Sequence, residues 1–238
     1  MKTKRTAPPA TGRDGALRLP AAAEPPTVPA VETDHDPGVL ERVSDPAIEL
    51  ALWQRQLPAD LAAWLEALPA ALLPVARFDV TPAGAGAALR AACDASGTPR
   101  GGQRDALIED ICALVARFAR IAGSASVRLR LQAVGDDACR RWHRDCVPLR
   151  LLSTYRGPAT QWLEPARGAL ALARPDEDVD APFFMSPHAV GLFKGCGFIE
   201  HTHESGIVHR SPRIAGTGVT RLVLCLNSAP AGMLEVPG

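Results

Sequence analysis

The spacing of the apolar side chains changes at Gly123, and this change constrains the fold more than any other feature of the chain. Over residues 103–121 the apolar residues recur every three or four positions, which predicts an amphipathic helix. Over residues 127–133 they alternate with Arg and Gln, which predicts a strand with one buried face. The first half is therefore predicted to be mainly helical and the second half to consist mainly of strands.

Further elements follow the same two periods. Asp45 followed by Pro46 predicts the beginning of a helix whose apolar stripe covers residues 48–53. Other helices are expected over residues 58–68 and 83–93, and a short strand over 77–80. In the second half, strands are expected over residues 142–146, 149–155, 160–163, 189–193, 206–209 and 219–227. Many short strands with Gly and Pro turns after a helical block favour a sandwich or barrel that helices support.

Composition divides the chain into a tail and one domain. Residues 1–37 are rich in Pro and Ala and short of large apolar side chains, so we expect a disordered tail. Residues 38–238 are expected to form a single globular domain, helical over 38–123 and a β-barrel that carries the site over 124–238. A hydrophobic content of 47% is ample for such a core.

Charge and cysteine usage limit the partners and the compartment. The 26 basic and 26 acidic residues balance, so the overall charge predicts no nucleic-acid partner. The chain has no apolar run of about 18 residues for a membrane span and no apolar stretch typical of a secretory signal. Its six cysteines are scattered without a Cys-x-x-Cys pair. We therefore expect a cytoplasmic protein with free thiols.

Three residues have the composition and order of an iron site with two histidines and one carboxylate. His143 and Asp145 are two positions apart, so on a strand both side chains project from the same face. His209 lies in a later predicted strand and supplies a third ligand. Such a site binds Fe(II) and leaves other positions open for a cosubstrate, a substrate or dioxygen.

Four further residues are candidates for binding a cofactor. Arg221, twelve positions after His209, begins an apolar strand and can hold a carboxylate through a two-pronged contact. Lys194 lies inside another apolar strand, where surface snorkelling and anion binding are both open. Arg150 and Tyr155 lie in the strand expected over 149–155 and are candidates for lining the same cavity.

Two other metal arrangements are open at this point. A Cys-x3-His-x2-Cys string can form a tetrahedral zinc site with a later Cys or His, although a strand would turn its second cysteine away from the histidine. Its candidate ligands are Cys139, His143, Cys146 and Cys196. The string Gly-x5-His-x-His, which contains His201 and His203, is the beginning of a cupin metal motif but lacks the glutamate expected a few residues later.

Three stretches of the second half are similar to a known family. They read PLRLLSTYRGPATQWL over residues 148–163, LFKG over 192–195 and HRSP over 209–212. In these stretches the chain resembles the bacterial family called domain of unknown function 1826. The resemblance implies no activity, but members often lie near genes of zinc homeostasis, which implies a context of metal handling.

The layout over residues 126–227 resembles a second group, the Fe(II)/2-oxoglutarate dioxygenases, in which a strand, His-x-Asp, further strands, His and Arg follow in this order. This resemblance implies an α+β fold in which the helical N-terminal half packs on a C-terminal double-stranded β-helix, a jelly-roll or cupin-like barrel. It also implies Fe(II) at His143, Asp145 and His209, with 2-oxoglutarate at Arg221. The leading hypothesis is an oxygenase of this kind, for which the sequence names no substrate. The alternatives are a non-catalytic protein that binds Zn(II) through the same ligands in metal homeostasis, and an interaction module with a decayed site.

Overall fold

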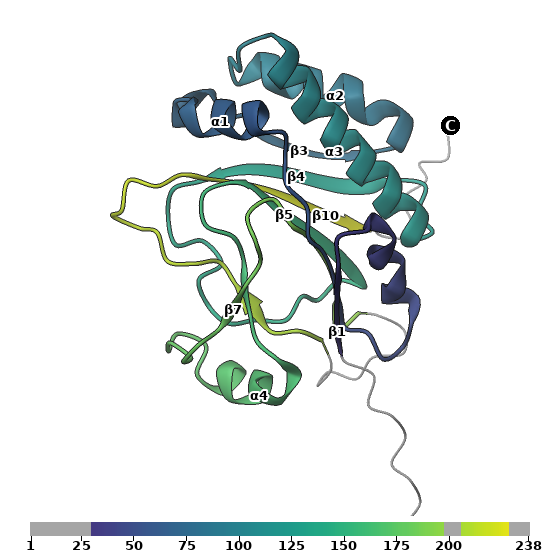
Figure 1. The fold of residues 1–238 in the computed structure, drawn as a ribbon, viewed down its shortest axis with the longest axis vertical. Coiled ribbons are helices and arrows are strands. Elements are labelled where there is room, and N and C mark those ends of the chain that lie inside the picture. Colours follow the sequence, from purple (N-terminus) through teal and green to yellow (C-terminus); the bar gives the residue numbers. More distant parts are fainter. Residues whose placement is uncertain (1–29, 198–205, 229–238) are drawn as a thin grey trace, which may run out of the picture.

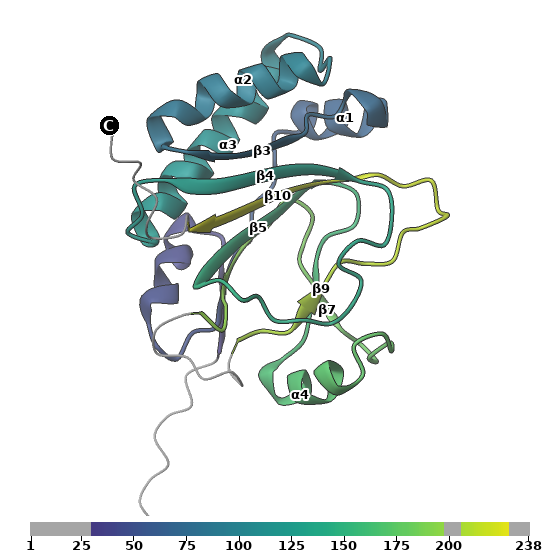
Figure 2. The same cartoon turned by 180° about the vertical axis from the view of Figure 1, so that it is seen from behind.

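A seven-stranded sheet forms the centre of the molecule, with the order β1-β2-β8-β5-β10-β4-β3. The computed structural model describes residues 30–197 and 206–228. A three-stranded sheet, β7-β6-β9, lies on one side of the large sheet, and helices α1, α2 and α3 lie on the other (Figure 1 and Figure 2). The strands are β1 (Val31–Asp34), β2 (Leu50–Trp53), β3 (Ala76–Val80), β4 (Val127–Val134), β5 (Leu149–Arg156), β6 (Gln161–Trp162), β7 (Phe183–Phe184), β8 (Val190–Lys194), β9 (His209–Arg210) and β10 (Arg221–Ser228). The helices are α1 (Ala59–Ala67), α2 (Ala85–Ala95), α3 (Gly102–Ile121) and α4 (Pro165–Ala173), with short 3-10 helices η1 (Pro37–Ser44), η2 (Ala70–Leu72) and η3 (Pro82–Gly84).

Strand alternation sorts the side chains of the large sheet into two faces. On β4, Leu129 and Leu131 are fully buried in the core shared with the helices, while Arg130 and Gln132 face the other way. On the neighbouring strand β10, Leu222, Leu224 and Leu226 join the same core. The apolar stripe of α3 covers this face, and each large apolar side chain buried there stabilises the fold by roughly 1.5–3 kcal/mol.

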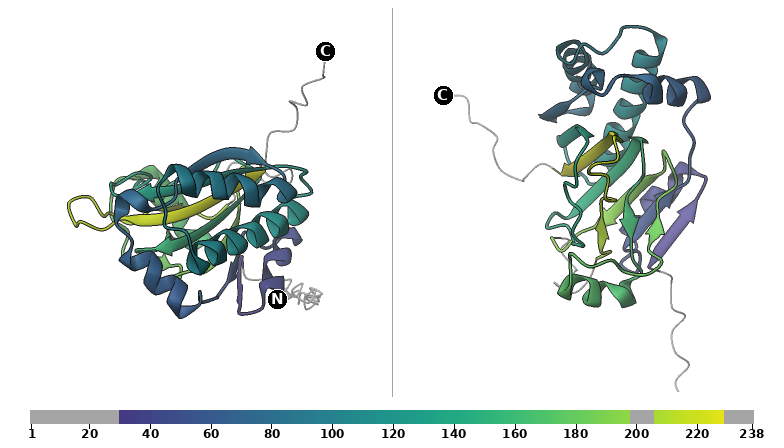
Figure 3. Two further views of the ribbon diagram at one scale, coloured as in Figure 1. Left: turned by 90° about the horizontal axis from the view of Figure 1, so that it is seen from above. Right: turned by 90° about the vertical axis from the view of Figure 1, so that its left-hand side faces the viewer.

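A second apolar cluster fills part of the space between the two sheets. Phe193 of β8, Trp162 of β6 and Ile207, just before β9, belong to it. Helix α4 packs on the outer side of the small sheet through a third cluster that contains Trp142 and Val208 (Figure 1). Figure 3 shows the resulting layers from two further directions. The polar face of the large sheet and the small sheet therefore face each other.

The strand order follows a regular alternation between the sheets. His143 forms an isolated antiparallel bridge with His209, so its segment lies next to β9 at the edge of the small sheet. From β4 onward the chain has eight extended segments: β4, the His143 segment, β5, β6, β7, β8, β9 and β10. The first, eighth, third and sixth of these, β4, β10, β5 and β8, are neighbours in this order in the large sheet. The second, seventh, fourth and fifth, which are the His143 segment, β9, β6 and β7, are neighbours in this order in the small sheet.

Most of the predicted elements are confirmed. The helices expected over residues 58–68, 83–93 and 103–121 correspond to α1, α2 and α3, and the strand expected over 77–80 corresponds to β3. The strands expected in the second half are present, with one exception, although β9 includes only the last residue of the range 206–209. The segment over 142–146 makes a single bridge instead of a strand.

The helix expected after Asp45 and Pro46 is wrong, because these residues are followed by strand β2. This strand pairs with β1 on one side and with β8 on the other. Its side chains enter both cores, Ala51 on the helical side and Leu50 and Leu52 on the other. A short strand buried on both faces is continuously apolar, and its sequence cannot be told from that of a buried helix.

The first half is therefore a mixture of helices and strands. Three of its strands, β1, β2 and β3, belong to the large sheet. The boundary expected after residue 37 is too late, since β1 lies before it, and residues 1–29 of the expected tail lie outside the described residues. Helix α4 was not predicted, although Pro165 in its first turn is a usual beginning of a helix. Among the described residues, none of the helices has the length and apolar character needed to cross a membrane.

Candidate metal centre

His143, Asp145 and His209 meet in three dimensions, as the sequence predicts. The bridge between the two histidines is made by two backbone hydrogen bonds of 3.1 and 3.0 Å, and their ring centres lie 4.6 Å apart. The Nε2 atom of His209 is 3.3 Å from Oδ2 of Asp145, and Nε2 of His143 is 3.9 Å from Oδ1. One possible ligand atom from each residue lies within 4.8 Å of the others.

Backbone carbonyls fix the form of both imidazole rings. Nδ1 of His143 is 2.8 Å from the carbonyl oxygen of Arg141, and Nδ1 of His209 is 3.2 Å from that of Ile207. A carbonyl oxygen only accepts hydrogen bonds, so each Nδ1 carries the proton when the ring is neutral. Both Nε2 atoms then present lone pairs, which is the arrangement typical of metal-binding histidines.

The electrostatics of the buried pair fit a cation. Burial lowers the pKa of His209 to about 4, so its ring is neutral at pH 7. Oδ2 of Asp145 is buried and has no hydrogen-bond partner within the described ranges. Two acceptor atoms, His209 Nε2 and Asp145 Oδ2, therefore face each other. A buried acceptor without a partner is unfavourable, and a metal ion bound to both atoms would satisfy them.

Arg150 holds the carboxylate of the group. Its Nη1 donates to Oδ1 of Asp145, and its Nε donates to Oδ1 of Asn227 at 2.9 Å. The predicted cofactor residue Arg150 therefore lies beside the candidate metal ligands and orients one of them. Asn227 was not singled out in the sequence, although it shares with Arg221 the alternation that puts both on one face of β10.

A pocket of about 130 Å³ opens beside the two histidines. Side chains of β4, β5 and β10 line it, among them Arg150 and Arg221. Arg221 is almost completely buried, and burial lowers its pKa to about 10, so it remains charged at pH 7. Its Nε donates to the carbonyl oxygen of Pro158 at 2.7 Å, but its buried Nη2 has no partner in the described part of the chain.

Tyr155 lies on the opposite face of the large sheet, so its predicted place in this cavity is wrong. Residues of β5 alternate, and Tyr155 shares the helix-covered face with Leu149 and Leu151. Its hydroxyl donates to Asp110 of α3, which also pairs with Arg55. Because of this alternation, Arg150 and Tyr155 cannot lie on the same face of β5. The sequence already contained this information.

Lys194 is likewise outside the pocket. In the pairing of β8 with β5 it lies opposite Leu149, so it faces the helical core. Its Nζ donates to the backbone carbonyl oxygens of Asp45 and Pro46 at 2.7 and 3.4 Å. The charged group of Lys194 is therefore buried against the connection between η1 and β2, and it does not line the pocket that contains Arg221.

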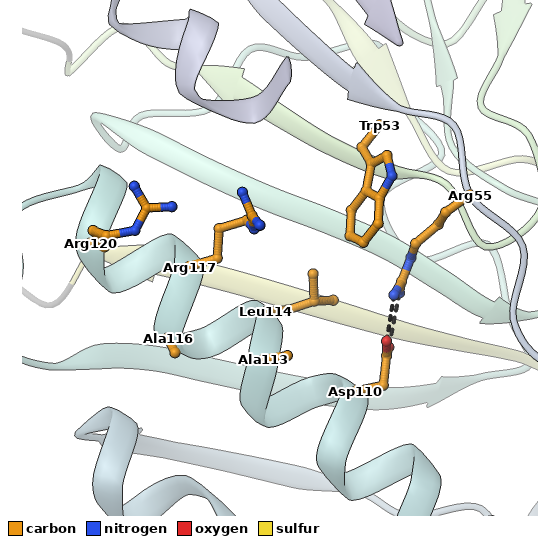
Figure 4. A pocket seen from close by; sticks show the side chains of 8 residues that line it. All are labelled: Trp53, Arg55, Asp110, Ala113, Leu114, Ala116, Arg117 and Arg120. Atoms are coloured by element: carbon orange, nitrogen blue, oxygen red, sulfur yellow. Dashed lines mark hydrogen bonds and ion pairs between the residues drawn. The ribbon is translucent and has the colours of Figure 1, made fainter. Parts of the chain in front are cut away.

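A separate pocket lies between α3 and β2 (Figure 4). Its charged side chains neutralise one another: Arg55 pairs with Asp110, and both Arg117 and Arg120 pair with Glu41. The view shows Arg55 reaching from beyond β2 toward Asp110 on α3. These ion pairs account for its charge, and it contains no group of possible metal ligands among the described residues.

The alternative metal ligands are not assembled. Within the described ranges, no cysteine joins the group formed by the two histidines and Asp145. Cys139 lines the pocket, whereas Cys146 contacts Cys196, whose pKa is raised by burial and by that neighbouring thiol. The residues of the cupin-like motif, His201 and His203, lie outside the described residues.

Comparison with known proteins gives one family and several distant folds. The family model described as "Protein of unknown function (DUF1826)" matches residues 34–227. No curated protein matches the chain. A dioxygenase for auxin oxidation from rice is 17% identical, with 84% of this chain and 85% of that chain covered and a TM-score of 0.44. The auxin dioxygenase AtDAO1 of Arabidopsis thaliana, in complex with 2-oxoglutarate, is 10% identical, with coverage of 87% and 93% and a TM-score of 0.45. A prolyl-4-hydroxylase of Pseudomonas putida is 14% identical, with coverage of 81% and 94% and a TM-score of 0.41. At TM-scores this low, these likenesses carry no weight for the activity of the chain.

Proposed function

The chain belongs to the DUF1826 family, and from its own site we propose that it is a non-haem Fe(II)- and 2-oxoglutarate-dependent oxygenase. One observation carries the proposal. His143, Asp145 and His209 bring three possible ligand atoms together beside a pocket that also contains the buried, incompletely paired Arg221. These residues can bind a metal ion and an anionic cosubstrate next to each other.

The strand order supports a double-stranded β-helix as the scaffold. Eight extended segments that alternate between two facing sheets in this order are typical of jelly-roll and cupin barrels. In the proposed barrel the histidines belong to the small sheet and Arg221 to the large sheet, so they approach the pocket from opposite walls. The helices α1 to α3 support the outer face of the large sheet.

The protein would hold Fe(II) through Nε2 of His143, Nε2 of His209 and a carboxylate oxygen of Asp145. When bound, Fe(II) and 2-oxoglutarate supply the oxidising chemistry, in which dioxygen converts 2-oxoglutarate to succinate and carbon dioxide and adds one oxygen atom to the substrate. The carbonyl groups of Arg141 and Ile207 keep both Nε2 atoms unprotonated.

The arginines have separate tasks in this proposal. Arg150 neutralises and orients Asp145 from the side away from Oδ2, because it contacts Oδ1. Arg221 receives the distal carboxylate of 2-oxoglutarate, which would satisfy its unpartnered Nη2. The aromatic ring of Phe193, 4.8 Å from the ring centre of His209, provides an apolar wall that limits access of water to this ligand.

The second candidate function is that of a metal-binding protein that does not act as an oxygenase. Two imidazoles and a carboxylate also bind Zn(II), which has no redox chemistry, and a role in metal homeostasis would follow. The donor set favours this candidate as much as the first one. The unpartnered Nη2 of Arg221 favours the oxygenase, because a structural zinc site does not need a carboxylate anchor.

The test is spectroscopic. The metal-free protein is loaded with Fe(II) under anaerobic conditions and titrated with 2-oxoglutarate, and a visible charge-transfer band is expected to appear at saturation. The same titration with the Arg221→Gln variant is expected to require a much higher concentration, while Fe(II) content stays equal. Tight Zn(II) binding that 2-oxoglutarate does not alter, together with no band in the Fe(II) form, would support the second candidate instead.

A further inference from the structure

Two arginines face each other across strands β3 and β4 on the pocket side of the large sheet. The antiparallel register pairs Arg77 directly with Arg130. On the other side of β4, Arg130 is paired with Cys225 of β10, and both line the pocket beside His143 and His209. Neighbours of Arg77 on β3, Ala76 and Phe78, contribute to the helical core, which confirms that Arg77 projects from the opposite face.

This pair has no counterion in the described part of the chain. Arg130 has a buried Nε without a hydrogen-bond acceptor, and neither Arg77 nor Arg130 takes part in an ion pair there. Like charges directly opposite each other in an antiparallel pair are destabilising. In the next pair on the same face the two charges are opposite in sign. Arg128 lies opposite Asp79 and donates to its carboxylate at 2.9 Å.

The proposed reaction does not use Arg77 or Arg130, because the other arginines of the pocket already have a partner or a task. Arg150 is paired with Asp145, Arg210 is paired with Asp178, and Arg221 is assigned to the carboxylate of the cosubstrate. Within the described ranges, Arg130 is the arginine of the pocket that has neither a partner nor a task in the reaction. It lies on the β4 side of the pocket, and the exposed Arg77 lies next to it. Two guanidinium groups at the edge of a pocket can share one anion through charge-assisted hydrogen bonds.

We propose that Arg77 and Arg130 bind an anionic group of the primary substrate, a carboxylate or a phosphate. The substrate is accordingly an anionic molecule, whose charged group lies at the β3–β4 edge while its reacting part extends toward the metal ligands. This inference rests on the proposed oxygenase function, but the binding site has its own residues and its own test.

The experiment uses the full chain with Fe(II) and saturating 2-oxoglutarate without oxygen, and inorganic phosphate as the probe. Phosphate binding is followed by phosphorus NMR at constant ionic strength. We expect the dissociation constant to rise at least tenfold in Arg77→Gln and in Arg130→Gln. The control Arg100→Gln removes one positive charge from an exposed residue that pairs with Asp94, and it should change phosphate binding less than twofold. Displacement of the phosphate by acetate then tells whether the site prefers a phosphate or a carboxylate.

The outcomes separate this inference from the function on which it rests. Equal phosphate binding by all variants, or none by the unaltered protein, would overturn the anion site even if the charge-transfer band forms normally. Weakened 2-oxoglutarate binding in Arg130→Gln would assign Arg130 to the cosubstrate and overturn it as well. A missing band in the unaltered protein, with arginine-dependent phosphate binding intact, would instead contradict the oxygenase and leave the anion site supported. Because Arg77 is exposed and its charge faces that of Arg130, its variant is expected to keep or slightly raise the melting temperature of the unaltered protein.

Discussion

Nε2 of His209 lies 3.3 Å from Oδ2 of Asp145, and neither atom carries a hydrogen to place between them. The proton of the neutral His209 ring is on Nδ1, where the carbonyl oxygen of Ile207 accepts it. The other carboxylate oxygen of Asp145, Oδ1, forms the ion pair with Arg150. Two lone pairs directed at each other in a buried place are a poor arrangement for the protein alone and a good one for a bound cation.

Replacing His209 by alanine should abolish metal binding under both candidate functions. The variant removes one of three ligands, and the remaining pair cannot hold the ion with comparable affinity. Metal content after loading and dialysis is the measurement. His35→Ala is the matched control, because His35 is exposed and lies outside the metal group. Unchanged metal occupancy in the His209 variant would remove this residue from the site.

Replacing Arg150 by methionine should weaken metal binding about 10- to 100-fold without removing a ligand. The reason is that Asp145 loses the group that orients its carboxylate and keeps Oδ2 available. Arg150→Lys is expected to recover part of the affinity, since it restores the charge but not the bond to Asn227. A competition titration with a metal chelator measures the affinity, and equal affinities in all three proteins would contradict this role.

Replacing Arg221 by glutamine should raise the dissociation constant of 2-oxoglutarate by about 10- to 100-fold, because a charge-assisted hydrogen bond contributes roughly 1.5–3 kcal/mol. Fe(II) binding should remain unchanged, since Arg221 is not among the metal ligands. The charge-transfer titration measures the affinity for 2-oxoglutarate, and metal content after loading and dialysis measures Fe(II) binding. A variant that binds 2-oxoglutarate as well as the unaltered protein would show that the anchor lies elsewhere.

Replacing Gly157 by alanine should also weaken 2-oxoglutarate binding. Its φ of +77° is unfavourable for alanine, and the new Cβ would lie 3.1 Å from Cγ of Arg221. The backbone conformation alone should destabilise the fold by about 1 kcal/mol. Gly216→Ala is a matched control, because Gly216 has a φ of +76° but no atoms near the added carbon. Both variants should lower the melting temperature, and only the first should change the titration. Equal titration curves would show that Gly157 does not position Arg221.

Replacing Tyr155 by phenylalanine should destabilise the fold and leave the site intact. The variant removes the hydroxyl that donates to Asp110 on the helical side, which should reduce the free energy of unfolding by about 1–3 kcal/mol. Chemical denaturation measures this change. Metal and 2-oxoglutarate binding are expected to remain within twofold of the unaltered protein, and a large loss of either would place Tyr155 back in the site.

Local patterns were sufficient for much of the fold. The apolar stripe over 103–121 and the alternation over 127–133 predicted α3 and β4 because each pattern has one period and one buried face. Residues 50–53 could not be assigned in this way, since β2 is buried on both faces and its pattern carries no period. The partners that make it a strand, β1 and β8, come from distant parts of the chain.

The sequence alone determined which residues share a strand face, because successive side chains of a strand always alternate. Alternation puts Arg150 on the same face as Leu152, and it also puts Arg221 on the same face as Asn227, although Asn227 was not predicted to belong to the site. Only the tertiary structure decided which face is covered by helices and which faces the pocket. This placed Arg150 in the pocket and left Tyr155 and Lys194 on the helical side. It also brought His209 beside His143, since the position of one strand against another is set by the packing of the whole barrel and not by either segment.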